Sequence, residues 1–405
     1  MCVLRFDIMG INLKPVIDFG KMPIANAFLT PEEFAAEYFY DMVLGYDQKT
    51  GAIGLVNTVA PEKMFHDHYA FYSSTSKGMQ AHFRQTAEKL LPYAGKGLVV
   101  ELGSNDGIML EAWKDLGVSA LGVEPSRNVA EVSKSRGHDV MEKFMDDATV
   151  DEILAKGHVS LVYSANTFCQ FENFSEYLGY VTRLIGRQGV FVFEDPYFLD
   201  IFEKTSYDQI YDEHVWYFTA SFINNMLEPF GFHVFDCEHL EVHGGELRMY
   251  VGHKDTHPAK PEVAVWLAKE GDLGKKLEIL DGNIKKSKTA LLEILRGLKK
   301  EGKKLCGFGA TSKGVIITNY CGIGPDLIPF ITDNTPIKQG KYYPGSHIPI
   351  LSQEVFEAGK TDRSKFIDCV FLGAWNHFNE INKYQAWYKE AGGKWLTHVP
   401  MPRII

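Results

Sequence analysis

The sequence predicts an α/β fold with two Rossmann-like units behind a small β-rich N-terminal module. First, residues 98–107 read as a buried strand, a tight glycine turn and the start of a helix. Second, strand-like apolar runs alternate with helical segments from about 98 to 255 and again from about 305, the pattern of doubly wound sheets. Third, residues 1 to about 70 mix short apolar runs with turns and lack helical periodicity.

The order of these patterns predicts three domains, at 1–70, 71–258 and 259–405. A helix is expected up to about residue 91, and another over 261–301 as a bridge between the two larger units. In the central unit we expect strands near 98–102, 119–123, 159–164, 189–194, 232–242 and 246–252, with helices near 108–116, 127–136, 148–156, 173–186 and 220–230. In the last unit we expect strands near 305–309, 327–333, 348–350, 366–372 and 395–398, with a helix ending at about 321.

The overall composition excludes several classes of function. The net charge is −10, from 42 basic and 52 acidic residues, so binding to nucleic acid or to anionic membranes is not expected. The six cysteines form no Cys-x-x-Cys pair, which indicates neither a zinc knuckle nor a disulfide framework. Neither a signal peptide nor a membrane-spanning apolar run is recognisable, so the cytoplasm is the expected compartment, and the oligomeric state stays open.

The glycine turn after the first central strand carries an acid where a dinucleotide site would carry a glycine. Glu101 opens the pattern Glu-x-Gly-x-x-x-Gly, and a carboxylate at this place repels phosphate but can pair with a cation. The next strand ends at Glu124, where a carboxylate can hold a ribose diol. An ordinary βα turn is the alternative, but the second acid favours a cofactor site.

Two amides follow the strand near 159–164. Ligands of such sheets lie beyond the carboxyl ends of the strands, so Asn166 and Gln170 are expected to face cofactor and substrate. Taken singly, each could equally be a helix cap or a surface amide.

The long segment after the strand near 189–194 carries a cluster of chemically active side chains. Tyr211, Glu213 and His214 supply a phenol, a carboxylate and an imidazole on one loop, and insertions at this end of a strand commonly carry function. Histidine suits proton removal because its pKa lies near neutrality. A surface loop with an incidental histidine is the alternative, since the chain has 14 histidines.

The last unit opens with Gly307-x-Gly309 and a turn that contains Lys313. A helix N-terminus beside such a turn can bind phosphate, with the lysine as counter-charge. The third glycine of a dinucleotide site is absent at the usual spacing, so NAD binding is only weakly indicated.

In combination, these motifs resemble the nucleotide-sugar C-methyltransferases, over nearly the whole chain. The Glu101–Gly107 turn resembles motif I of class I S-adenosylmethionine (SAM) methyltransferases, and family members combine a small zinc-binding domain, a SAM domain and a Rossmann-like C-terminal domain. The matching stretches are Phe19-Gly20-x-x-Pro23-Ile24-Ala25-Asn26, Tyr69-x-x-Tyr72-Ser73-Ser74, Glu124-Pro125-Ser126, Ala165-Asn166, Ile210-Tyr211-x-Glu213-His214, His243-Gly244-Gly245-x-Leu247-Arg248, Lys338-Gln339-Gly340-Lys341 to Pro344-Gly345-x-x-Ile348-Pro349, and Trp375-Asn376.

The resemblance implies a SAM-dependent enzyme that removes a proton beside the keto group of a nucleotide-linked 4-keto-deoxysugar and methylates that carbon. It implies His214 as base, Tyr211 and Tyr72 near the enolate, and Glu213 on the substrate. The candidate SAM-binding residues are Glu101, Gly103, Asn105, Asp106, Glu124, Ser126 and Asn166. The candidate substrate-binding residues are Gln170, His243, Arg248 and Lys313, the last with the 307–314 turn on the diphosphate.

Three departures from the family pattern stand out. The paired zinc cysteines are absent, because only Cys2 lies near the first pair, so we expect an N-terminal module without structural zinc. Gln170 takes the place of the family's histidine and cannot accept a proton at neutral pH. Glu246 takes the place of a serine in His-Gly-Gly-Ser-Leu-Arg. Three alternatives stay open. The loss of the histidine at 170 permits O-methylation of a sugar or related small molecule, and the 307–314 turn permits a nicotinamide-dependent oxidoreductase. The third alternative is a non-catalytic SAM- or sugar-nucleotide-binding protein.

Overall fold

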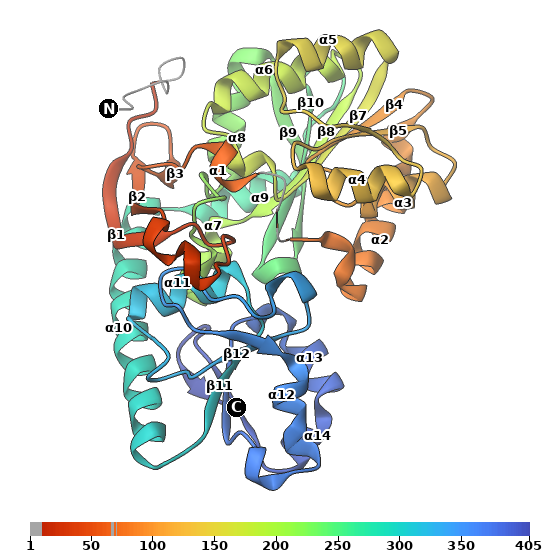
Figure 1. The fold of residues 1–405 in the computed structure, drawn as a ribbon. Helices are drawn as coiled ribbons and strands as arrows, with labels where there is room; N and C mark the ends of the chain where they lie inside the picture. The colour runs from red at the N-terminus through yellow and green to blue at the C-terminus, as the bar shows by residue number, and fades with distance from the viewer. Residues whose placement is uncertain (1–9, 66–68, 70) are drawn as a thin grey trace.

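The computed structural model describes residues 10–65, 69 and 71–405, which form three β-sheets (Figure 1). The α/β architecture with two Rossmann-like units is confirmed, as is the β-rich N-terminal module. Among the described residues, no helix has both the length and the apolar character that crossing a bilayer requires.

The N-terminal module is a three-stranded antiparallel sheet. Its strands are β1 (Lys14–Pro23), β2 (Phe39–Asp47) and β3 (Ala52–Leu55), followed by the short helix α1 (Pro61–Met64). Buried side chains alternate with exposed ones along the strands, as at Ile17 and Phe19 in β1 and at Tyr40 and Met42 in β2, as expected for a sheet covered on one face. The sheet also joins the central unit, because Leu55 N donates to Val215 O and Tyr217 N donates to Ile53 O.

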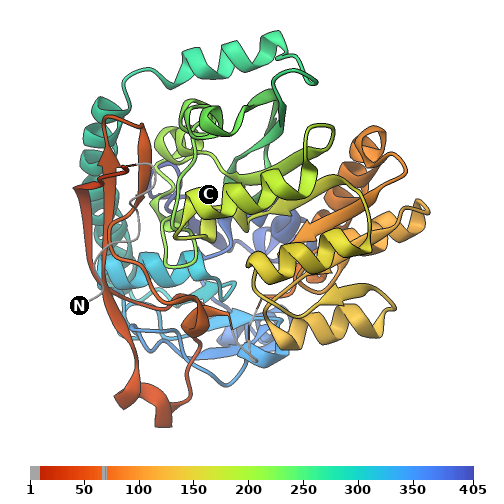
Figure 2. The same cartoon turned by 90° about the horizontal axis from the view of Figure 1, so that it is seen from above.

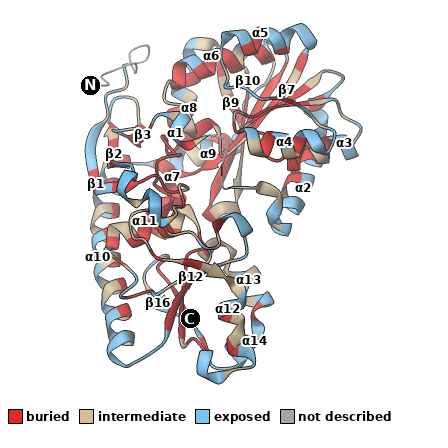
Figure 3. Cartoon of the chain, in the orientation of Figure 1, coloured by how far each residue is buried: buried red, intermediate tan, exposed pale blue. Residues whose placement is uncertain are grey.

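The central unit is a seven-stranded sheet in the order β6-β5-β4-β7-β8-β10-β9. All neighbouring strands are parallel except β10, which runs antiparallel to both β8 and β9. Figure 3 shows the buried strands of this sheet between more exposed helices. The strands are β4 (Leu98–Leu102), β5 (Ala120–Val123), β6 (Asp139–Met141), β7 (Val159–Ala165), β8 (Val190–Pro196), β9 (Phe232–Leu240) and β10 (Glu246–His253). The helices are α2 (Lys77–Ala94), α3 (Ile108–Asp115), α4 (Arg127–Ser135), α5 (Asp147–Lys156), α6 (Phe174–Ile185), α7 (Phe198–Lys204) and α8 (Ala220–Leu227).

The segment expected as a single helix over 261–301 is two helices, α9 (Pro261–Glu270) and α10 (Leu273–Lys300). Gly271 adopts φ +55°, which ends α9, and the Asp272 side chain accepts from Lys275 N and so caps α10. The long α10 contacts β1, α7 and α11, so it packs against all three parts of the molecule. Figure 2 shows it beside the N-terminal strands, at the edge opposite α2–α5.

The C-terminal unit is a six-stranded sheet in the order β13-β12-β11-β14-β15-β16, parallel except for the final strand. The strand expected over 327–333 is shorter, because only Ile331–Asp333 pairs with neighbours. The strands are β11 (Leu305–Phe308), β12 (Ile331–Asp333), β13 (Ile350–Ser352), β14 (Cys369–Leu372), β15 (Lys394–Thr397) and β16 (Arg403–Ile404). The helices are α11 (Ser312–Cys321), α12 (Gln353–Glu357), α13 (Phe378–Tyr384) and α14 (Ala386–Glu390).

Candidate active site

A cavity of about 940 Å³ lies where the carboxyl ends of both parallel sheets meet. Residues from all three parts of the chain line it, including Asn26 of the N-terminal module. Of the predicted site residues, the cavity is lined by Tyr72, Gly103, Asn105, Glu124, Asn166, Gln170, Tyr211, Glu213, His214, His243 and Lys313. Four others, namely Glu101, Asp106, Ser126 and Arg248, are buried behind this lining.

The turn after β4 brings bare backbone to the cavity. Gly103 has φ +71°, and a Cβ added there would lie 2.1 Å from Thr167 Oγ1, so only glycine fits. The Glu124 carboxylate receives two backbone donors, Asn105 N at 2.9 Å and Ser126 N at 2.8 Å. Held in this way at the end of β5, it faces the cavity in a fixed orientation, which suits a ribose diol.

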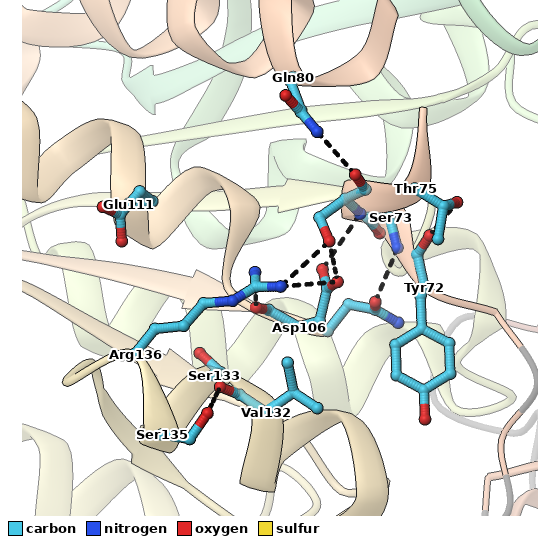
Figure 4. Close-up of polar contacts among 12 residues, drawn as sticks. Tyr72, Ser73, Thr75, Gln80, Asp106, Glu111, Val132, Ser133, Ser135 and Arg136 are labelled. Carbon is cyan, nitrogen blue, oxygen red and sulfur yellow. Dashed lines mark hydrogen bonds and ion pairs between the residues drawn. The ribbon is translucent and has the colours of Figure 1, made fainter. Parts of the chain in front are cut away.

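The segment 71–76 covers this turn and is fastened to it by hydrogen bonds. Ser73 N donates to Asn105 Oδ1 at 3.0 Å, and Ser74 donates to Asp106 through both its N–H and its hydroxyl. Figure 4 shows Arg136 reaching toward Asp106, whose backbone oxygen accepts from Arg136 Nη1 at 2.9 Å. Asp106 therefore fixes the segment 71–76 over this turn.

Glu101 lies beneath the turn. Burial raises the pKa of its carboxyl well above the usual range, and the nearby charges of Glu124 and Asp106 raise it further. Its Oε2 has no hydrogen-bond partner among the described residues. Glu101 thus lies behind the residues that line the cavity, in surroundings that disfavour its charged form.

Three residues that line the cavity were not predicted from the sequence. Lys143, Phe144 and Met145 line it and follow β6, a strand of only three residues that was not predicted. The signal available was the apolar Val140-Met141 pair ahead of Phe144, since a third strand is expected in this type of sheet.

The loop after β8 carries Glu213, whose carboxylate contacts two side chains that are distant in sequence. Glu213 accepts from Asn26 Nδ2 at 2.6 Å and from Tyr69 Oη at 3.0 Å. The neighbouring Asp212 accepts from Ala25 N at 3.0 Å. Burial raises the pKa of both carboxyl groups, and the Glu213 charge further raises that of Asp212. The N-terminal module therefore positions this loop, with Asn26 and Tyr69 as partners that were not predicted.

Tyr211 and His214 form a pair on the same loop. The Tyr211 hydroxyl lies 3.0 Å from His214 Nε2, and both side chains are buried and border the cavity. Burial, together with the charge of Lys313, lowers the pKa of His214 to about 3. The imidazole is therefore neutral at neutral pH.

Tyr72 reaches the cavity from the covering segment, and its ring points away from Asp106 and Arg136 (Figure 4). Its hydroxyl accepts from Asn128 Nδ2 at 2.8 Å, which leaves the hydroxyl hydrogen available for a ligand. Asn128 also exchanges two hydrogen bonds with the Tyr69 backbone. One residue of α4 thus orients both tyrosines.

The C-terminal unit contributes positive charge at its own glycine turn. Gly309 has φ +87°, and Thr311 caps α11 by accepting from Gly314 N at 3.0 Å. Burial lowers the pKa of Lys313, whose ammonium makes no hydrogen bond or ion pair with the part of the chain that the structure describes. Lys338, which is buried, donates to Ala310 O at 2.8 Å. The turn therefore offers backbone donors and a lysine to an anion.

Arg248 and His243 differ in their surroundings although they lie on one motif. The Arg248 guanidinium lies behind the cavity wall, donating to Glu194, Glu238 and Thr86. His243 borders the cavity with φ +51°, and burial lowers its pKa well below the usual value. Arg248 therefore stabilises the sheet beneath the site, and its contact with substrate stays a prediction.

The described part of the N-terminal module does not fit a zinc ion. Residues 10–65 contain neither cysteine nor histidine, and the described residues hold no cluster of three metal-ligating side chains. Asp47 instead ties the sheet together, accepting from Asn12 N at 3.2 Å, Lys49 N at 3.0 Å and Thr50 Oγ1 at 2.8 Å.

Comparison with known proteins gives three consecutive family matches. Residues 10–65 match the family described as "Putative zinc binding domain", residues 77–236 match "Methyltransferase domain", and residues 241–400 match "C-methyltransferase C-terminal domain". The C-methyltransferase NovU of Streptomyces niveus is 30% identical over 400 residues, which cover 96% of this chain and 94% of NovU.

Solved structures resemble the chain over less than half its length. A SAM-dependent methyltransferase of Thermotoga maritima is 19% identical, with a TM-score of 0.33, over 43% of this chain and 88% of its own. The CcbJ methyltransferase of Streptomyces caelestis is 14% identical, with a TM-score of 0.37, over 46% of this chain and 96% of its own.

The family matches identify the molecule as a methyltransferase of class I with an added C-terminal unit. The chain belongs to the C-methyltransferase family that includes NovU, and it is a SAM-dependent enzyme.

Proposed function

We propose that the enzyme transfers a methyl group from SAM to a carbon atom of a nucleotide-linked keto-deoxysugar, in the cytoplasm, through an enolate. Residues 1–70 are assigned to the module that supports the loop with Tyr211, Glu213 and His214, which we call the catalytic loop. Residues 71–258 are assigned to the SAM domain and 259–405 to the sugar-nucleotide side. The observation that carries it is the position of Tyr211, Glu213 and His214 between an acidic glycine turn and a lysine-bearing one, in a single cavity.

The two ends of the cavity suit ligands of opposite charge. When bound, SAM supplies an electrophilic methyl group on a sulfonium, and Glu124 and Asn105 line the end that would hold it. At the other end, the N-terminus of α11 and Lys313 favour the diphosphate of a sugar nucleotide. The sugar between them would lie beside the catalytic loop.

In the proposed reaction, the proton leaves the carbon beside the keto group for the Tyr211–His214 pair, with His214 as final acceptor. The electron pair of the broken C–H bond forms the enolate, then the new C–C bond to the methyl group. The S–CH₃ pair returns to sulfur, leaving S-adenosylhomocysteine (SAH). The neutral state of His214 is the one that this step requires.

The enolate oxygen needs a donor, and Tyr72 can supply one. Its hydroxyl oxygen already accepts from Asn128, which polarises the remaining O–H toward a ligand. Glu213, held by Asn26 and Tyr69, would bind a sugar hydroxyl and fix the ring against the pair.

Deuterium exchange tests the proton step. A nucleoside diphosphate 4-keto-6-deoxyhexose in D₂O should exchange hydrogen at the carbon beside the ketone without SAM, and His214→Ala should slow exchange and methylation by about 10²–10⁴-fold. The control is His158→Gln, an exposed histidine outside the cavity, which should leave both rates unchanged.

Other outcomes select a different function. Unchanged exchange in His214→Ala would remove this residue as the base. A methylated product that retains its ring hydrogen in D₂O would indicate O-methylation. Tight binding of NAD without any response to SAM would indicate an oxidoreductase, and SAM binding without any methylated sugar would indicate a binding protein.

A further inference from the structure

Glu246 and Gln170, two departures from the family pattern, both form hydrogen bonds with Asn166. Asn166 Nδ2 donates to Glu246 Oε1 at 2.7 Å, and Gln170 Nε2 donates to the backbone oxygen of Asn166 at 2.6 Å. Asn166 has φ +51°, an unfavourable conformation for a residue with a side chain, and its N–H donates to Glu194 O at 2.7 Å. Its side chain and its backbone are thus both held in place.

These contacts fix which end of each amide faces the cavity. A backbone carbonyl only accepts hydrogen bonds, so Gln170 must turn its nitrogen to Asn166 and its oxygen elsewhere. In the same way, the bond from Nδ2 to Glu246 leaves Oδ1 as the free end of Asn166. Both side chains border the cavity, where each offers its carbonyl oxygen as an acceptor.

The side chains of Asn166 and Gln170 adjoin different parts of the site. Asn166 precedes Thr167, whose hydroxyl would collide with a Cβ at Gly103, so it adjoins the turn of the methyl donor. Gln170 lies between Cys169 and Phe171, whose backbone oxygens accept from Trp216 N at 3.0 Å and Trp216 Nε1 at 2.8 Å. Trp216 is two residues beyond His214, so Gln170 adjoins the catalytic loop.

We propose that Glu246 is a positioning residue that holds Asn166 as an acceptor for a hydrogen of the methyl donor. We also propose that Gln170, held by Asn166, selects a methyl acceptor that carries a hydroxyl on a carbon beside the keto group. The second part rests on the proposed sugar substrate, and the first depends only on SAM as the methyl donor.

The surroundings of Glu246 support the neutral form of its carboxyl group. The side chain is fully buried, and Oε2 has no partner among the described residues. Burial raises the pKa of Glu246 well above its usual range, and the charges of Glu194 and Asp195 raise it further. A glutamine has the shape and the carbonyl acceptor of a protonated glutamate, so it should replace Glu246 without loss.

The first test is titration of the whole enzyme with SAH by calorimetry. Glu246→Gln should bind within about twofold of the wild type, whereas Glu246→Leu should bind about tenfold more weakly, because Asn166 loses its acceptor. If Glu246→Leu unfolds, Glu246→Ser provides the comparison. Equal SAH affinity in a folded Glu246→Leu or Glu246→Ser variant, or a tenfold loss in Glu246→Gln, would overturn the positioning role.

The second test compares two sugars, a nucleoside diphosphate 4-keto-6-deoxyhexose with its 3-hydroxyl and the matching 3-deoxy compound. The wild type should have a KM about tenfold lower for the hydroxylated sugar, and Gln170→Leu should remove that difference while kcat changes less. An undiminished preference in Gln170→Leu, or none in the wild type, would overturn the selection role. If neither sugar is methylated, the proposed substrate and the Gln170 role fail together, and the SAH titrations still decide the Glu246 role.

Discussion

The two Rossmann-like units share one backbone hydrogen-bond arrangement at their glycine turns, and they differ in the charges around these turns. In each, a glycine turn follows the first strand, and the acid that ends the second strand accepts a backbone N–H of that turn. Glu124 accepts from Asn105 N at 2.9 Å in the central unit, and Asp333 accepts from Ala310 N at 2.6 Å in the C-terminal unit. The polar geometry at the two turns is therefore alike.

The charges of the side chains around the two turns differ between the units. Buried acids surround the central turn, with Glu101 and Asp106 beside Glu124. Two lysines, the half-buried Lys313 and the buried Lys338, accompany the C-terminal turn. One fold element can therefore serve a cationic ligand or an anionic one, and the added charges, rather than the glycines, decide which.

Removing the carboxylate of the central turn should have the largest effect on ligand binding. Glu124→Gln replaces one acceptor oxygen by a donor, so it loses a backbone partner as well as the charge that suits a ribose diol. We expect SAH affinity to fall by about 10–100-fold, measured by calorimetry, with uridine and thymidine diphosphate affinities unchanged. Glu88→Gln, an exposed acid on α2, is the matched control. A parallel loss of diphosphate binding would show that the two ends are not independent.

The reciprocal change is Lys313→Met in the C-terminal unit. Its ammonium has no protein partner among the described residues, so its loss should affect the ligand more than the fold. We expect uridine and thymidine diphosphate to bind about tenfold more weakly and with less salt dependence, while SAH binds as before. Lys303→Met removes an exposed lysine of the same unit and should change neither affinity. Unchanged diphosphate binding in Lys313→Met would separate Lys313 from the anion site.

Local sequence patterns were sufficient to predict much of the fold and several residues of the cavity. The strand–turn–helix pattern located Gly103 and Gly309, and the rule that ligands lie beyond the carboxyl ends of parallel strands located Asn166 and Gln170 at the cavity. These features depend on a few consecutive residues and on strand order. For the same reason, most of the strands and helices of the central unit lie near their predicted positions.

Contacts between distant segments could not be predicted in this way. Asn26 reaches Glu213 across 187 positions, and no periodicity encodes that pairing. The sequence motif that contains Arg248 predicted where this residue lies but not what it contacts. Its guanidinium forms ion pairs with Glu194 and Glu238 inside the sheet. The break at Gly271 was missed because helical apolar spacing continues on both sides of it.

The charge contrast between the units depends on whether Glu101 is ionised, and pH-dependent stability can decide this. Its pKa is raised in the folded state, so between the unfolded value of about 4.3 and the folded pKa the native state binds more protons than the unfolded chain. Stability from this group is therefore lost as pH rises through that window, and Glu101→Gln should abolish the loss.

We expect the Tm of Glu101→Gln to exceed that of the wild type by about 2–4 °C at pH 8 and to equal it at pH 4.5, in thermal denaturation without ligand. The control Glu88→Gln should follow the wild type at both values. Equal Tm values for Glu101→Gln and the wild type at pH 8 would mean that Glu101 is charged in the folded enzyme. The central turn would then be fully acidic before the methyl donor binds, and the contrast with the lysine-bearing turn would be stronger still.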